Sequence, residues 1–348
     1  MRYIYLLAFL FLLSCANGSK VVVDDAATSA ILVKGEKITG VNLEMPKTRI
    51  LDGDLDDLLE VNIGWAAMVP YGMTKKGGAK VFFEYNGGYW WGESVEGTSE
   101  CIRIAQEAGL KTMVKPHVWV VGDGWPGDFK LKKERDWKAW EASYRDYILA
   151  HAKLADSMSV DLFCIGTEYR NAVVDRKKFW VALIKEVRGI YNGPITYASN
   201  WDNYEAITFW DHLDFIGVDT YFPLSSEKNV SRDKLKEGWA DIGSKFSEFS
   251  KKYDRRILFT EYGFKSVDYT SAPNYGANED TLSPNMENQV VAYNAFFETV
   301  WQQDWMAGGF FWKWHVIGEK GGAENTRYTP QGKPALDVIR EWYGKAKE

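Results

Sequence analysis

The stretch RILFTEYGF, residues 256–264, is a short apolar run that ends on a carboxylate, Glu261. Its aliphatic and aromatic residues predict a buried strand. A buried carboxylate without a partner is costly, so this glutamate should either face a polar cleft at the strand mouth or pair with a cation inside the protein. A second stretch, DLFCIGTEYR at residues 161–170, ends in the same way on Glu168. Two predicted strands therefore each end on a glutamate.

Strand-like apolar runs alternate with amphipathic, helix-like segments from Lys37 to the end of the chain. The predicted strands are residues 37–43, 62–72, 111–120, 161–168, 195–201, 213–223, 256–264 and 306–314. The predicted helices are residues 51–61, 98–110, 136–158, 176–191, a short piece near Tyr204, 231–252, 288–303 and 333–344. This unbroken alternation implies right-handed crossovers and a closed parallel sheet, so we expect an α/β fold, a single-domain (β/α)8 TIM barrel. An open doubly wound sheet is the alternative, but no glycine-rich phosphate fingerprint follows the first strand.

The composition argues against nucleic acid and favours carbohydrate as the partner. The 348 residues include 42 Lys and Arg against 48 Asp and Glu, a net charge of −6, and the basic residues are scattered along the chain. A nucleic-acid-binding protein would instead cluster them on one face. The 16 tryptophans are too many for one core to hide, so many should be partly exposed. An exposed indole plane suits the apolar face of a sugar ring.

The chain begins with MRYIYLLAFLFLLSCANGSK, in which an early arginine precedes an apolar run. The run is too short for a permanent membrane helix and is typical of a cleaved export signal. The Leu-Leu-Ser-Cys that ends it resembles a bacterial lipobox, which implies cleavage before Cys15 and lipid on its thiol; a plain signal peptide is the alternative. We expect a signal peptide (1–14), a tether (15–34) and a catalytic barrel (35–348) in an exported bacterial lipoprotein, periplasmic or at the cell surface, that contacts the membrane only through Cys15.

The two glutamates are expected at the same end of the barrel. Loops at the carboxyl ends of the strands form the active site of such barrels, and both Glu168 and Glu261 end their strands. Two carboxyl groups that face each other across a cleft are what cleavage of a glycosidic bond requires, one as proton donor and the other as an ionised group. A separation of roughly 5 to 5.5 Å would mean retention of configuration, and about 6.5 to 9.5 Å would mean inversion.

Polar and aromatic side chains at other strand ends fit a sugar subsite, because hydroxyl groups need hydrogen bonds and ring faces need stacking partners. The candidates for substrate binding are Trp65, His117, Trp119, Asn200, Asp219, Tyr221, Tyr262 and Trp312. Tyr221 could donate to the nucleophilic carboxylate, while Asp219 is the main rival carboxylate. The other cysteines, Cys101 and Cys164, are predicted to be buried thiols. No spaced ligand cluster predicts a metal site, and no cofactor is expected.

Several phrases in this order resemble a known family. They are GWAAMVPYG, KPHVWVVGDGWPGD, FCIGTEYR, IGVDTYFPL, FTEYGF and FFWKWH. The sequence is similar to clan A of the retaining glycoside hydrolases and most closely to glycoside hydrolase family 113, over residues 38–342. Members of this family are mostly β-1,4-mannanases, so the resemblance implies Glu168 as acid/base, Glu261 as nucleophile and Trp312 as the aromatic floor of the cleavage subsite. Thr167 stands where many clan members carry Asn, which leaves recognition of the sugar 2-hydroxyl open between Thr167, Asn200 and His117.

The leading hypothesis is a retaining, endo-acting β-1,4-mannanase that hydrolyses mannan, glucomannan or manno-oligosaccharides by double displacement. One alternative is a retaining glycosidase for another β-linked glycan. A second is a non-catalytic carbohydrate-binding lipoprotein on the same barrel, although binding alone would not need two facing carboxylates. A third, a metal-dependent barrel hydrolase, has too few histidines: His117, His151, His212 and His315.

Overall fold

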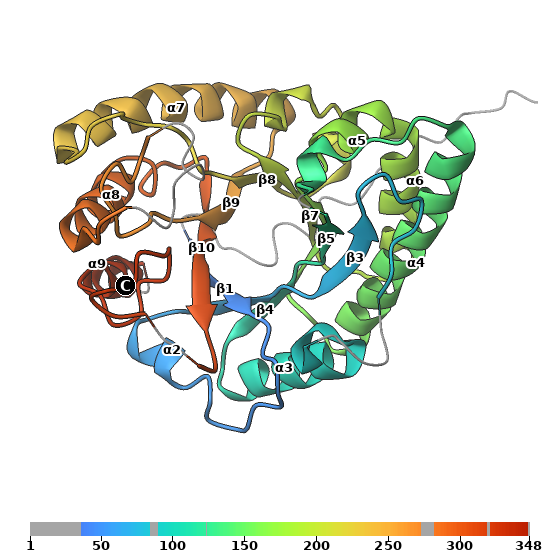
Figure 1. The fold of residues 1–348 in the computed structure, drawn as a ribbon, viewed down its shortest axis with the longest axis horizontal. Coiled ribbons are helices and arrows are strands. Elements are labelled where there is room, and N and C mark those ends of the chain that lie inside the picture. Colours follow the sequence, from blue (N-terminus) through green and yellow to red (C-terminus); the bar gives the residue numbers. More distant parts are fainter. Residues whose placement is uncertain (1–35, 84–89, 123, 273–281, 319–320, 347–348) are drawn as a thin grey trace, which may run out of the picture.

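The computed structural model describes residues 36–83, 90–122, 124–272, 282–318 and 321–346. Eight parallel strands close into a barrel in the order β1, β10, β9, β8, β7, β6, β4, β2 (Figure 1). The strands are β1 Ile38–Glu44, β2 Trp65–Met68, β4 Lys111–Val114, β6 Leu162–Thr167, β7 Ile195–Asn200, β8 Ile216–Asp219, β9 Ile257–Tyr262 and β10 Met306–His315. The closed barrel confirms the predicted (β/α)8 fold. The predicted signal peptide and tether lie outside the described residues.

Helices surround the barrel (Figure 1). They are α2 Asp57–Glu60, α3 Val95–Glu107, α4 Glu134–Ser157, α5 Arg170–Asp175, α6 Lys177–Arg188, α7 Arg232–Tyr253, α8 Met286–Thr299 and α9 Ala335–Lys345. The predicted helix at 51–61 forms only the short α2, α5 was not predicted, and the connection after β7 carries the 3-10 turns Tyr204–Ala206 and Trp210–His212. Among the described residues, no helix combines the length and the apolar character needed to cross a membrane.

Two of the predicted strands are each divided by a proline. Pro70 separates β2 from β3 (Tyr71–Lys75), and Pro116 separates β4 from β5 (His117–Val121). Proline has no N–H to give to a sheet and restricts the residue before it, so pairing within the barrel stops at these points. Beyond the prolines, β3 and β5 pair with each other as a separate two-stranded parallel sheet (Figure 1).

The small sheet changes where two candidate residues lie. The prediction of single strands at 62–72 and 111–120 is wrong, because the barrel strands stop before the prolines. His117 and Trp119 therefore do not end a barrel strand but stand in β5, where His117 is paired with Tyr71 of β3. The extension carries these side chains beyond the carboxyl ends of β2 and β4.

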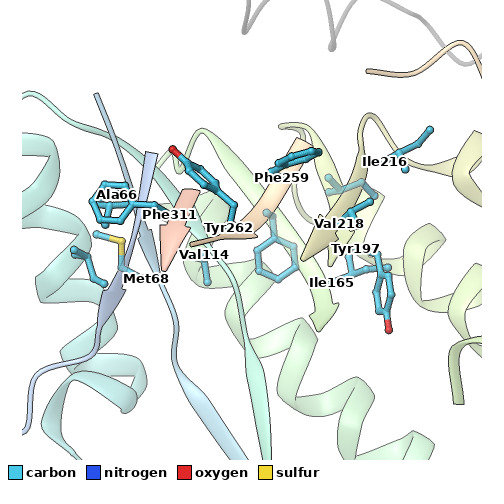
Figure 2. Packing of buried hydrophobic residues seen from close by; sticks show 14 of the residues in the cluster. Ala66, Met68, Val114, Ile165, Tyr197, Ile216, Val218, Phe259, Tyr262 and Phe311 are labelled. Atoms are coloured by element: carbon cyan, nitrogen blue, oxygen red, sulfur yellow. The ribbon is translucent and has the colours of Figure 1, made fainter. Parts of the chain in front are cut away.

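The core has two layers because side chains alternate across each strand. The interior of the barrel is filled, mostly from the amino ends of the strands, by Ile38, Trp65, Ala67, Met113, Leu162, Phe215, Leu258, Ala307 and Phe310. The alternate residues belong to a larger cluster that includes the helices, among them Ala66, Met68, Val114, Ile165, Val218 and Phe259 (Figure 2). Cys101 and Cys164 are buried and unpaired, as predicted.

Trp65 belongs to the interior layer and not to a sugar-binding loop. It is the first residue of β2 and only 4% exposed, and its ring meets that of Phe310 edge-on at 6.3 Å. Gly40 makes room for this layer, since a Cβ there would collide with the Phe310 ring. The prediction that Trp65 binds substrate is wrong because the residue starts its strand, at the end of the barrel opposite Glu261.

Tyr262 also points away from the barrel interior. It is 1% exposed, stacks on Phe296 of α8 with ring centroids 4.6 Å apart, and its hydroxyl lies 2.6 Å from that of Tyr343 in α9. The Tyr343 hydroxyl in turn donates to the carbonyl of Gly40 in β1 at 2.8 Å. Tyr262 therefore fastens β9 to the helical layer, and its predicted role in substrate binding is wrong.

We expect Tyr343→Phe to lower the free energy of unfolding by about 1 to 3 kcal/mol, because it leaves the buried Gly40 carbonyl and the Tyr262 hydroxyl without this partner. Urea denaturation followed by fluorescence measures the change. Tyr269→Phe is the matched control, since Tyr269 is 42% exposed. Equal stability of the two variants would contradict a structural role for the buried hydroxyl pair.

Candidate active site

Glu261, in β9, is a buried carboxylate with two partners. Its side chain is 8% exposed, and Oε1 forms an ion pair with the Nζ of Lys115. Oε2 accepts a hydrogen bond of 2.8 Å from the hydroxyl of Tyr221. Of the two alternatives raised for this strand-ending glutamate, pairing with a cation is the one observed, at the carboxyl end of the barrel. The predicted contact with Tyr221 is present.

Lys115 was not among the predicted site residues. It follows β4 directly, is fully buried, and its Nζ also lies 5.5 Å from the centre of the Trp312 ring. Burial alone would lower the pKa of Lys115, but the carboxylates of Asp219 and Glu261 outweigh this effect and raise it. The sequence does contain an indication that Lys115 is a site residue. Like Glu261, Lys115 places a charge in an apolar run, and it directly precedes Pro116.

Glu168 follows β6 and is partly exposed. Its backbone adopts a left-handed conformation with φ of 53°, which is rare outside glycine and is found mostly where surrounding structure enforces it. The indole N–H of Trp125 donates to Oε2 at 2.8 Å. Burial, and then the negative charge of Glu261, raise the pKa of Glu168 to about 7, although the Trp125 hydrogen bond opposes the shift. The two glutamates therefore lie within each other's electrostatic field.

The surroundings of the two carboxyl groups differ in kind. A cation and a hydroxyl hold Glu261, as suits an anion, whereas Glu168 has an indole donor and a pKa near neutrality. Pairs of carboxyl groups in glycosidases are separated in this way into a proton donor and an ionised partner. The arrangement therefore combines a group able to give a proton with a group held as an anion at the same end of the barrel.

A cavity of about 370 Å³ opens beside Trp312. Its walls are Leu43, Glu44, Met45, Val69, Tyr71, Met73, Trp90, Glu93, Trp119, Trp312 and Lys313. Trp119 is 60% exposed and meets Tyr71 edge-on, with ring centroids 6.4 Å apart. The structure thus brings the predicted residues Trp119 and Trp312 together. A larger hollow of about 570 Å³ lies on the outer wall between α7 and α8. Neither Glu168 nor Glu261 is among the lining residues of either hollow.

His117 and Asn200 lie near the charged centre. The His117 ring packs on Tyr71 at 4.9 Å. Burial, together with the charge of Lys115, lowers the pKa of His117 to about 4, so the imidazole is neutral at pH 7. Asn200, the last residue of β7, is 9% exposed, and its Oδ1 accepts from the N–H of Trp201 at 2.9 Å.

Asp219 does not line the cleft. It ends β8 and is fully buried, and its Oδ1 accepts a hydrogen bond of 2.7 Å from the hydroxyl of Thr260. The predicted contact between Asp219 and substrate is not available in this arrangement, because the side chain is fully buried and bonded to Thr260. Among the described residues, no group of three or more His, Cys, Asp or Glu side chains is arranged to hold a metal ion.

Residues 47–333 match the profile of Glycoside Hydrolase Family 113. The chain belongs to this family. The family and the barrel are thus those that the resemblance implied. No curated protein sequence matches the chain.

Solved structures share the fold. The family 113 β-mannanase AaManA from Alicyclobacillus acidocaldarius, in complex with ManMIm, has a TM-score of 0.78 and 23% identity, over 89% of this chain and 98% of that one. Another family 113 β-1,4-mannanase, also in a complex, has a TM-score of 0.74 and 24% identity, over 89% and 99% of the two chains. A family 5 mannosidase from Rhizomucor miehei has a TM-score of 0.60 and 10% identity, over 91% and 97%.

Glu168→Gln should become more stable relative to the parent protein as the pH rises. A carboxyl group with a raised pKa binds its proton more tightly in the folded state, so its ionisation between pH 4.5 and about 7 destabilises the parent but not the glutamine variant. The relative gain should reach about 2 to 3 kcal/mol at pH 8. Urea denaturation of both proteins from pH 4 to pH 8 measures it. A difference that stays flat over this range would contradict the assigned environment of Glu168.

Proposed function

We propose that this family 113 protein is a retaining, endo-acting β-1,4-mannanase. The proposal rests on two carboxyl groups with different surroundings at the carboxyl end of the barrel. Glu261 is held by Lys115 and Tyr221, and Glu168 has a pKa of about 7. The substrate class is supported by the two family 113 structures described above, which are β-mannanases. Mannan, glucomannan and manno-oligosaccharides are the proposed substrates, and the residues at the rim need no cofactor for this chemistry.

In the first step, Glu261 attacks the anomeric carbon while Glu168 gives its proton to the leaving oxygen. The bond from the anomeric carbon to that oxygen breaks as the bond to Glu261 Oε forms. Lys115 and Tyr221 orient the attacking carboxylate through their contacts with Oε1 and Oε2. The nearly neutral pKa of Glu168 suits the transfer, because a general acid works best when its pKa lies near the working pH.

In the second step, Glu168, now ionised, takes a proton from water as the water oxygen attacks the anomeric carbon. The bond to Glu261 breaks, and the carboxylate returns to Lys115 and Tyr221. Two inversions at one carbon give net retention of the β configuration. Trp125 keeps Glu168 oriented through both steps, since its indole N–H donates to Oε2.

The aromatic cavity is the proposed site for sugars on the glycone side. Glu168 must stand beside the leaving group, and its indole partner, Trp125, does not line the cavity. The cavity lies instead on the side of Trp312, where the ring that bears the reacting carbon would rest. Trp90 and Trp119 offer further stacking surfaces there.

Internal cleavage is favoured by the continuation of this cavity. A second hollow of about 480 Å³ shares Glu44, Met45 and Trp90 with the first and reaches His315 and Arg327. A chain that continues beyond the first glycone sugars would follow these hollows, and an enzyme that cuts only chain ends would not need them. We therefore propose endo action.

Recognition of the axial 2-hydroxyl of mannose is proposed for Asn200 and His117. Thr167, the third candidate, is 1% exposed and its hydroxyl donates to the Pro116 carbonyl at 3.3 Å. That bond occupies its donor and turns it away from the cleft. The amide of Asn200 ends β7, and the neutral ring of His117 begins β5, just beyond the carboxyl end of β4.

Export and lipid anchoring at Cys15 remain part of the proposal. They rest on the sequence of the first residues, which lie outside the described part of the chain. An anchored enzyme with an open cleft would meet polysaccharide fragments at a periplasmic or cell-surface location. The proposed division is a signal peptide at 1–14, a tether at 15–34 and the barrel at 35–348.

Removal of each glutamate tests the mechanism. Glu261→Ala should lower kcat/KM on manno-oligosaccharides by at least about 10⁴-fold, because it removes the nucleophile. Glu168→Ala should lose about 10² to 10⁴-fold on the same substrates, yet keep its first step on 2,4-dinitrophenyl β-mannoside, whose leaving group needs no proton. Azide should then restore turnover of that substrate and give a β-mannosyl azide.

The control is Glu237→Gln on α7, which is exposed and should match the parent. Proton NMR of the first-formed product should show the β anomer. Full activity of Glu261→Ala would refute the nucleophile assignment, and a first-formed α anomer would refute retention. Sugar binding without cleavage by the parent would point to the non-catalytic alternative, and faster cleavage of cello-oligosaccharides than of manno-oligosaccharides would point to another β-glycan.

Trp119→Ala tests the glycone cavity. We expect its KM for mannotetraose and longer oligosaccharides to rise about 3- to 10-fold with little change in kcat, because one stacking surface is lost away from the reacting bond. Val121→Ala is the matched control, since Val121 is exposed on the same face of β5 but does not line the cavity. An unchanged KM in Trp119→Ala would exclude this wall from sugar binding.

A further inference from the structure

Lys115 lies in the field of two carboxyl groups, although it forms its ion pair with only one. Asp219 is paired in register with Glu261 on the neighbouring strand, and both side chains are buried at the same end of the barrel. A negative charge on Asp219 would act on Lys115 in the same direction as that of Glu261 and raise its pKa. Its Oδ1 accepts from Thr260, but its Oδ2 is buried without a hydrogen-bond partner among the described residues. A buried carboxyl oxygen is seldom left in this condition, so it calls for an explanation.

The free enzyme is balanced without a charge on Asp219. Lys115 and Glu261 neutralise each other in the ion pair. Burial, and then the charge of Glu261, raise the pKa of Asp219 well above its ordinary value, against the opposing effect of Lys115. A protonated Asp219 beside an ionised Glu261 leaves this centre close to neutral, which avoids an uncompensated buried charge.

Formation of the covalent intermediate changes the net charge of this buried centre. In the double displacement proposed above, on which this inference rests, Glu261 becomes a neutral ester. Lys115 is then a fully buried cation that has lost the charge of its partner, a state that is strongly unfavourable. We propose that Asp219 is the alternate counter-ion of Lys115, losing its proton to solvent water when Glu261 is esterified and regaining a proton when Glu261 is released.

The step balances in atoms and charge. The bond from the anomeric carbon to Glu261 forms as the bond to the leaving oxygen breaks, and separately the O–H bond of Asp219 breaks and water accepts the proton. The second half-reaction reverses both changes. Asp219 acts through Lys115 and does not touch the sugar, so it is a positioning residue.

The groups that act electrostatically on Asp219, or that its charge acts on, come from several strands. They are Lys115, Cys164, Glu168, Tyr197, Tyr221 and Glu261. Of these, Glu168 also titrates near neutrality, and it must be held constant in any measurement of protons. Glu168→Gln does so, because glutamine cannot ionise.

Proton release on formation of the intermediate tests the proposal. Glu168→Gln mixed with 2,4-dinitrophenyl β-mannoside should form the ester and stop, because the phenolate leaves as an anion and no base activates water. We expect a burst of phenolate accompanied by about one proton per enzyme, recorded with an indicator dye in weak buffer between pH 6 and pH 8. The double variant Glu168→Gln/Asp219→Asn should release fewer than about 0.2 protons per phenolate, and its burst should be roughly 10- to 100-fold slower.

Asp214→Asn, in the same Glu168→Gln background, is the control. Asp214 precedes the other end of β8 and is also buried, where it binds Arg188 and the N–H of Ile195. It should release as many protons per phenolate as the background does. A full burst without proton release, or equal release in the Asp219→Asn protein, would overturn the proposal. Absence of any phenolate burst would instead count against the proposed function.

Discussion

The ion pair between Lys115 and Glu261 is the contact on which the rest of the site depends. Neither side chain could be buried alone, so the ends of β4 and β9 are tied to each other at the mouth of the barrel. Tyr221 completes the restraint on Glu261, and the Trp312 ring lies beside the same ammonium group. Glu168 remains on the more open side, where its pKa responds to the charge that the pair holds in place.

The fold and the two glutamates could be read from the sequence because both follow from local pattern. Apolar runs alternating with amphipathic segments fix the order of strands and helices, and parallel strands of a barrel point the same way, so residues that end strands share a rim. Glu168 and Glu261 were found by this rule alone. The contact between Tyr221 and Glu261 was also accessible, since it joins the ends of neighbouring strands.

The sequence did not reveal on which face or at which end of a strand a residue lies, or where the pairing between barrel strands stops. Trp65 and Tyr262 carry the right chemistry for sugar binding, but one begins its strand and the other faces the helices. Pro70 and Pro116 lie within stretches that are otherwise strand-like, and only the three-dimensional pairing reveals that they end the barrel strands. The role of Lys115 was not predicted because it depends on an ion pair with Glu261, which lies 146 positions away in the chain.

The small β3 and β5 sheet has a consequence for how such an enzyme can be modified. It pairs within itself and not with the barrel strands, yet it carries Tyr71, Met73 and Trp119 to the wall of the cavity. The closure of the barrel therefore does not depend on which side chains this ribbon presents. Exchanging its exposed face could retune the length or decoration of the polysaccharide accepted while the scaffold that performs the bond-breaking is kept intact, which makes the ribbon a natural module for engineering.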